Sequence, residues 1–201
     1  MRHAPCVRPR HELLTIAGLT AATAAFGAAV ALAATSKTVA FSDPKGDVSG
    51  ALDLQRVSLK RASDGRLRAV VTLAAKAEPS AFLARSGPPG SICLKVWTDA
   101  DADPQASVPD RLVCVTARAN DELRASVFEQ AEQGLPKRLG SASVAINASG
   151  RSIVLRVSQT SLGRPKLIRF AVESTRPGCD RVSCIDGAPD KGAVRRFRLH
   201  D

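Results

Sequence analysis

Short segments in which apolar and polar residues alternate with a period of two dominate this chain from Thr38 onward. The clearest examples are Leu52–Leu59 and Ile153–Val157. Such alternation places one face of an extended strand against a core and the other toward solvent, whereas an amphipathic helix repeats its apolar residues every three to four positions. The sequence therefore predicts an all-β protein.

Ten segments fit a strand pattern, and Gly-, Pro- and Asp-containing turns separate them. They are Thr38–Phe41, Leu52–Leu59, Leu67–Leu73, Ile92–Trp97, Leu112–Ala117, Ala125–Phe128, Ala142–Ile146, Ile153–Val157, Leu167–Val172 and Val194–Leu199. About ten short strands with frequent turns predict two packed antiparallel sheets, a sandwich of the jelly-roll or immunoglobulin-like kind. Only Ser80–Arg85 and Ser158–Gly163 are candidates for short helices.

The beginning of the chain has the composition of an export signal. Three arginines within the first ten residues precede the uncharged, apolar segment Leu13–Ala34, which contains the small-x-small pattern Ala31-Leu32-Ala33. This order predicts a secretory signal peptide over residues 1–33 and one domain over residues 34–201, secreted to the cell envelope and free of the membrane after cleavage. The apolar segment is also long enough to span a bilayer, so an uncleaved N-terminal anchor is the alternative.

Four cysteines follow the leader, an even number that allows three pairings and favours disulfides in an exported protein. A hairpin that places Cys93 opposite Cys114 also places Trp97 opposite Asp110, so Cys93–Cys114 would close the intervening loop at its base. The short spacing between Cys179 and Cys184 favours a local bridge. A zinc site is the weaker alternative, because no C-x-x-C knuckle or nearby histidine is present.

Aspartates gather in the connections between the expected strands. They are Asp43, Asp47 and Asp53 around the first connection, Asp99, Asp101, Asp103 and Asp110 between the two cysteine-bearing strands, and Asp180, Asp186 and Asp190 in the loop before the last strand. Calcium takes six to eight oxygen ligands from flexible loops of this kind. Pro104 stands where an EF-hand needs glycine, which excludes that motif. The alternative is that these aspartates begin turns and cap backbone amides.

The loop motifs resemble those of a family of secreted bacterial β-sandwich domains. Asp43-Pro44-x-Gly46-Asp47 with Leu52-Asp53-Leu54, the segment Trp97–Pro104, and the segment Asp186–Gly192 before a closing strand are similar to loops of carbohydrate-binding module family 9 and DOMON domains. The resemblance covers nearly the whole chain after the leader. It implies a jelly-roll-like sandwich with calcium stabilisation. It also implies one acidic corner formed by Asp43, Asp47 and Asp53, with Asp99, Asp101 and Asp103 as further ligands.

Trp97 and the basic charge bear on possible partners. Trp97 either lines a binding face beside the acidic loop or packs in the core, and the core position is the favoured interpretation. The net charge of +10 comes from basic residues scattered along the strands, which indicates a solvated surface or, alternatively, attraction to an anionic polymer or glycan of the envelope. Nucleic acid is not expected, because the chain has no Tyr and one Trp to provide stacking platforms.

The inventory of reactive side chains argues against catalysis. His3 and His11 lie in the leader and His200 is the penultimate residue, so no Ser-His-Asp or Cys-His site is expected. We therefore expect a non-catalytic binding or structural module of the cell envelope that is stabilised by calcium. The alternatives are an exported hydrolase that acts through carboxylates on a glycan or other envelope substrate, and an inhibitor or adhesin that acts on a protein partner.

Overall fold

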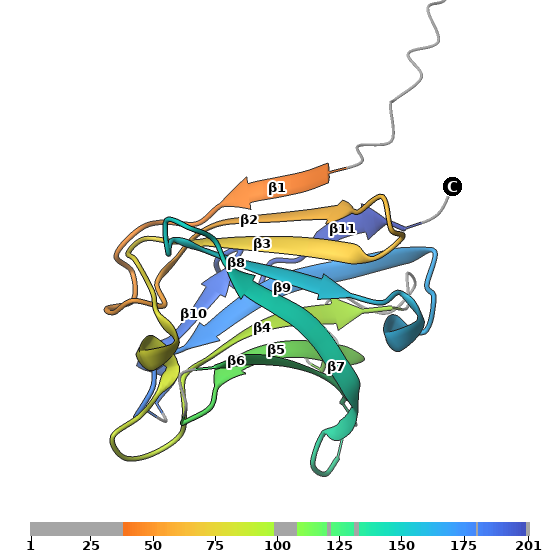
Figure 1. Ribbon diagram of the computed structural model, residues 1–201. Helices are drawn as coiled ribbons and strands as arrows, with labels where there is room; N and C mark the ends of the chain where they lie inside the picture. Colours follow the sequence, from red (N-terminus) through yellow and green to blue (C-terminus); the bar gives the residue numbers. More distant parts are fainter. Residues whose placement is uncertain (1–37, 99–107, 120–121, 131–132, 180, 200–201) are drawn as a thin grey trace, which may run out of the picture. The chain divides into compact units, whose positions relative to one another are not determined.

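The part of the chain that the structure describes is all-β, as the alternation predicts, and has 11 strands where the sequence indicates about ten (Figure 1). The computed structural model describes residues 38–98, 108–119, 122–130, 133–179 and 181–199. All of these belong to one compact unit, Thr35–Asp201. The predicted signal peptide over residues 1–33 lies outside the described residues.

Five strands form what we call the first sheet, and every neighbouring pair in it is antiparallel. In spatial order they are β1 (Thr38–Ser42), β2 (Leu54–Arg61), β3 (Leu67–Leu73), β8 (Ser152–Val157) and β7 (Lys137–Ile146). The second sheet begins with the same β7 and is antiparallel throughout. It continues with β6 (Leu123–Glu129), β5 (Arg111–Ala117), β4 (Ser91–Trp97), β9 (Leu167–Thr175) and β10 (Ile185–Ala188), while β11 (Arg195–Arg198) also pairs with β9.

Strand β7 belongs to both sheets and connects them. Its first part, up to Ala142, pairs with β6, and its last part, Ser143 to Ile146, pairs with β8. Figure 1 shows β7 crossing from one layer to the other. The expected two packed layers are therefore one continuous sheet that curls nearly into a barrel, because a single long strand changes partners along its length.

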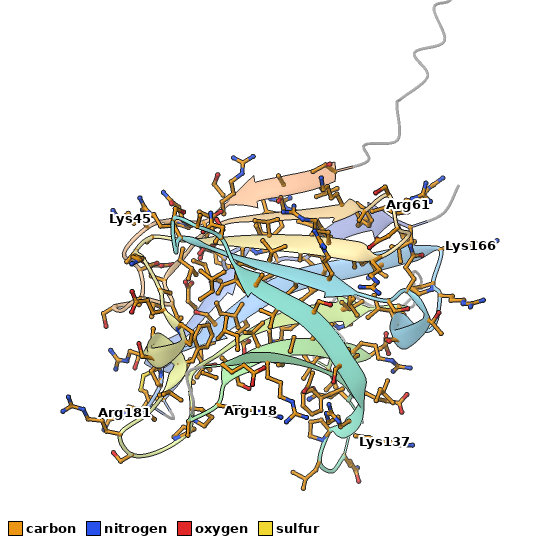
Figure 2. All side chains as sticks on the ribbon, in the orientation of Figure 1. Lys45, Arg61, Arg118, Lys137, Lys166 and Arg181 are labelled. Carbon is orange, nitrogen blue, oxygen red and sulfur yellow. A yellow bond between two sulfur atoms is a disulfide. The ribbon has the colours of Figure 1, made fainter. Side chains whose placement is uncertain are left out.

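The apolar face of each strand points into one common core between the layers. Val57, Leu59 and Val71 from the first sheet are completely buried, as are Leu94 and Phe170 from the second. In β2, β3 and β4 the buried residues occupy alternate positions, and side chains with polar ends extend from the outer faces (Figure 2), whereas in β9 the residues Ile168–Val172 are all buried. The period-two pattern in the sequence thus specifies which side of each strand faces the core.

The departures from the expected elements are local. The two candidate helices are single 3₁₀ turns, Pro79–Phe82 and Thr160–Leu162, and a third 3₁₀ turn spans Val182–Cys184. Strand β10 (Ile185–Ala188) lies in a region that the sequence predicts as a loop, so this strand is an addition to the expected elements. In the described part of the chain, no helix has the length and apolar character needed to span a bilayer.

Candidate metal centre

The connection between β1 and β2 is organised by its own aspartates. Asp53 accepts a hydrogen bond from the backbone N–H of Gly46 on Oδ2, at 2.9 Å, and the backbone N–H of Asp43 donates to the carbonyl of Gln55, also at 2.9 Å. Gly46 has a φ of +88°, a left-handed conformation that favours glycine. The sequence Asp-Pro-Lys-Gly-Asp therefore makes a tight loop that folds back onto the start of β2.

Asp186 connects this loop region to the second sheet. It lies on β10, opposite Ser174 of β9, and its Oδ2 accepts a hydrogen bond from the backbone N–H of Leu54 at 2.6 Å. The Ser174 hydroxyl donates to the carbonyl of Leu52 at 2.6 Å. Two side chains of the second sheet thus satisfy backbone groups of Leu54, the first residue of β2, and of Leu52 just before it. This places the Asp186 carboxylate next to the β1–β2 loop.

Three aspartates converge where these elements meet. One carboxylate oxygen each from Asp43, Asp47 and Asp186 lies within 4.8 Å of the other two. Asp43 and Asp186 are buried, with 6% and 2% of their surface exposed, whereas Asp47 is exposed. Asp53, also buried, interacts electrostatically with Asp47 and Asp186. We call these four residues the acidic corner.

Several oxygens of the acidic corner have no hydrogen-bond donor among the described residues. Both carboxylate oxygens of Asp43 are buried without a donor, and so is one oxygen, Oδ1, of Asp53 and of Asp186. Buried polar atoms in proteins are almost always satisfied, and an unpaired buried charge is especially costly. The acidic corner therefore has free oxygen ligands that point to a proton or a cation as the missing partner.

Burial and mutual repulsion shift the titration of these carboxyls. Burial, followed by the negative charges of Asp186, Asp190 and Asp47, raises the pKa of Asp43 to about 7. Burial also raises the pKa of Asp186 to about 6, against the hydrogen bond from Leu54, which lowers it. Burial is likewise the main reason why the pKa of Asp53 is raised. Near neutral pH the acidic corner thus becomes more negative with rising pH, and a bound cation would favour the ionised carboxylates.

The donor set limits which metal fits. All candidate ligand atoms are carboxylate oxygens, and hard cations such as Ca²⁺ and Mg²⁺ prefer oxygen, whereas zinc prefers nitrogen and sulfur. Calcium also tolerates irregular geometry and bidentate carboxylates. Asp43 has both oxygens available for such binding, and two further buried oxygens come from Asp53 and Asp186. The acidic corner therefore fits calcium better than a transition metal.

The structure brings together three of the seven aspartates for which sequence analysis predicted metal binding, Asp43, Asp47 and Asp53, and it adds Asp186. Asp186 lies in a segment that the sequence predicts as a loop, and it is not among the predicted ligands. It begins the loop motif Asp186–Gly192, but no local feature of the sequence marks it as buried.

The second acidic loop gives a different result. Asp99, Asp101 and Asp103 lie outside the described residues, so their role as metal ligands stays a prediction. Asp110 accepts hydrogen bonds on Oδ2 from the backbone N–H and the hydroxyl of Thr98, at 2.6 and 3.0 Å. Asp110 thus closes the base of this loop by capping backbone, the alternative role considered for these aspartates.

Trp97 does not pack in the core, and that favoured interpretation is wrong. Ile92, Leu94 and Val96 are the buried residues of β4, so the alternation places Trp97 on the outer face. There it lines a hollow of about 300 Å³ together with Lys95, Glu173 and the segment between β10 and β11. The alternative position, on an outer face, is the one observed, and ligand binding by Trp97 stays a prediction.

The disulfides follow the favoured pairing. Cys93 is bonded to Cys114, and the two residues face each other directly in the β4–β5 ladder. Cys179 is bonded to Cys184. Disulfides are typical of proteins that mature in oxidising surroundings.

No protein-family model matches the chain, and neither a curated protein nor a solved structure shows a match to it.

Proposed function

We propose that this protein is an exported, non-catalytic binding or structural module, and that one calcium ion at the acidic corner fastens the β1–β2 loop to β10. The observation that supports this most is the pair of buried carboxylates, Asp43 and Asp186, which lie close together with oxygens that no donor in the described part of the chain satisfies. A divalent cation would satisfy these oxygens and cancel the repulsion between them. Because the ion would bind the folded state only, it would stabilise the fold by linkage.

The same geometry supports the proposed family relation. The resemblance to carbohydrate-binding module family 9 and DOMON domains implies an acidic corner from Asp43, Asp47 and Asp53, and these residues lie together beside Asp186. The all-β fold agrees with the sandwich that the resemblance implies. We therefore keep the relation as a proposal, together with secretion to the cell envelope, which the two disulfides favour.

The competing function is an exported hydrolase that uses carboxylates. A carboxyl with a raised pKa can act as a general acid, and Asp43 and Asp186 have this property. However, neither residue lines the hollow beside Trp97 or the hollow of about 600 Å³ beside the end of β7. Their hydrogen bonds and neighbours connect backbone segments, which favours a structural role.

Thermal unfolding with calcium, with magnesium and with chelator tests the proposal. We expect calcium to raise the melting temperature of the wild-type protein and magnesium to raise it less. In Asp43→Asn/Asp186→Asn, calcium should have no effect, while the melting temperature in chelator should exceed that of the wild type because the repulsion is gone. Asp64→Asn, in the exposed β2–β3 turn, is the matched control and should keep the full calcium response. An equal calcium response in the double variant and the wild type would disprove the site.

A further inference from the structure

Three cations lie side by side on the outer face of the first sheet. Lys60 of β2 is directly opposite Arg68 of β3, and Arg68 is directly opposite Arg156 of β8. Lys60 and Arg156 are exposed and Arg68 is half-buried. We call these three residues the cationic row.

The cationic row is electrostatically unfavourable in the isolated protein. Neighbouring strands are about 4.8 Å apart, so the three side chains start from closely spaced positions. Like charges directly opposite each other on neighbouring strands destabilise a sheet. None of the ion pairs found among the described residues involves Lys60, Arg68 or Arg156.

The first sheet has no acid that could relieve this repulsion. Its five strands β1, β2, β3, β7 and β8 contain no Asp or Glu. The second sheet is different, because its strands carry acids that form ion pairs, Lys95 with Glu173 and Arg111 with Glu129. It also has cations outside these pairs, such as Arg124 and Arg196. What distinguishes the first sheet is a row of three cations on neighbouring strands that contain no acid.

A strip of small side chains lies beside the cationic row on the same face of the sheet. One step along the sheet, Val70 lies opposite Ser58 and Val154, and Val154 lies opposite Ala145. Ser58, Val70 and Val154 are half-buried, Ala145 is exposed, and all four side chains are small. The five strands contain a single aromatic residue, Phe41, whose ring packs against Phe170, so the strip offers apolar contact without a stacking platform.

We propose that this face binds an acidic polysaccharide whose chain lies across β2, β3 and β8, with successive carboxylates on the cationic row and sugar C–H groups against the strip. Arginine binds carboxylates through two parallel hydrogen bonds, which suits Arg68 and Arg156. A polymer with repeated anions matches repeated cations better than a single small anion does. The inference deepens the proposed binding function by naming its partner, but it does not depend on calcium.

Binding to hyaluronate oligosaccharides, measured by calorimetry in chelator and in increasing salt, tests this inference. We expect binding of the wild-type protein at low salt, and none to neutral dextran of equal length. In Arg68→Gln/Arg156→Gln the affinity should fall about tenfold or more, and the slope of log affinity against log salt should shrink by about one for each cation removed.

A charge-matched control distinguishes binding at the cationic row from non-specific attraction between a basic protein and a polyanion. Lys137→Gln/Arg181→Gln removes the same charge from exposed positions that Figure 2 shows at the side of the molecule away from β1 and β2. This variant should bind nearly as well as the wild type. Equal losses in both double variants, no binding by the wild type, or binding to polyphosphate and single-stranded DNA in preference to hyaluronate would each overturn the inference.

The two proposals fail separately. A wild-type protein that shows no calcium response but still binds hyaluronate would contradict the metal site alone. A wild-type protein that is stabilised by calcium but ignores hyaluronate would contradict the cationic row alone.

Discussion

The acidic corner and the cationic row are both clusters of like charge that no ion pair found among the described residues neutralises, but they differ in their access to water. Asp43 and Asp186 are buried where the β1–β2 loop meets β10, whereas Lys60 and Arg156 stand on an exposed sheet face. Water and salt screen exposed charges strongly and buried charges weakly. Repulsion between like charges therefore lowers the free energy of unfolding strongly at the acidic corner and only slightly at the cationic row.

Because of this difference, we expect the acidic corner to affect the stability of the fold and the cationic row to affect the binding of a partner. A buried cluster must be neutralised before the fold is stable, by protons or by a metal ion, so the acidic corner couples folding to solution conditions. An exposed cluster is tolerated without neutralisation and remains available to an external polyanion. Four predictions test this contrast, beginning with the largest expected effect.

The stability of the protein in chelator should fall as pH rises. The folded state holds protons on Asp43, with a pKa of about 7, and on Asp186, with a pKa of about 6, whereas the unfolded chain releases them near pH 4. The destabilisation is thus absent below about pH 4 and complete above about pH 7, with a total on the order of 7 kcal/mol because the two pKa values together are raised by about five units. Urea unfolding across this range measures it. Saturating calcium should remove the decline, and a rise in stability with pH in chelator would contradict the prediction.

Losing the hydrogen bond from Leu54 should have the next largest effect. Asp186→Ala and Asp186→Asn both remove the negative charge, but only Asn keeps an acceptor for the buried N–H of Leu54. We expect the Ala variant to be less stable than the Asn variant by about 1 to 3 kcal/mol in chelator. Denaturant unfolding of the two variants side by side measures the difference. Equal stabilities would show that Asp186 does not connect the sheets through this bond.

The conformation of the β1–β2 loop gives a smaller effect. Gly46→Ala should cost about 1 kcal/mol because φ is +88°, although the added methyl group would meet nothing within 4 Å. The same change should weaken calcium binding, because Gly46 positions Asp53. Gly140→Ala on β7 is the control, since that site is also open and lacks a positive φ. Equal unfolding midpoints for the two variants would show that the left-handed conformation at Gly46 does not contribute to stability.

Alternation predicted most of the scaffold, because burial on one side of a strand is a local property of the sequence. The segment Leu67–Leu73 is a strand with the predicted bounds, and the expected register of Cys93 with Cys114 is the one observed. The dual role of β7 was not predictable in this way. Its first residues, Lys137 and Arg138, are exposed and show no clear alternation.

The acidic corner was predicted only in part for a related reason. Asp43, Asp47 and Asp53 are close in sequence, so a loop motif can indicate that they gather. Asp186 joins them through its hydrogen bond with Leu54, a residue 132 positions earlier in the chain. Nothing in the sequence around Asp186 marks it as buried. The cationic row has the same property, because only the register of β2, β3 and β8 makes Lys60, Arg68 and Arg156 neighbours.

The smallest expected effect concerns the stability of the cationic row. Arg68→Thr places a good strand former between Lys60 and Arg156 and removes both like-charge contacts, so the free energy of unfolding should rise by about 0.5 kcal/mol at low salt. Arg124→Thr, whose partner on β5 is the neutral Thr116, should gain less. Denaturant unfolding at low and high salt measures both, and salt should erase the difference between them. If Arg68→Thr stabilises the protein and weakens hyaluronate binding, the cationic row lowers the stability of the protein slightly and contributes to binding. If it destabilises the protein at low salt, the three cations do not repel one another as the register indicates.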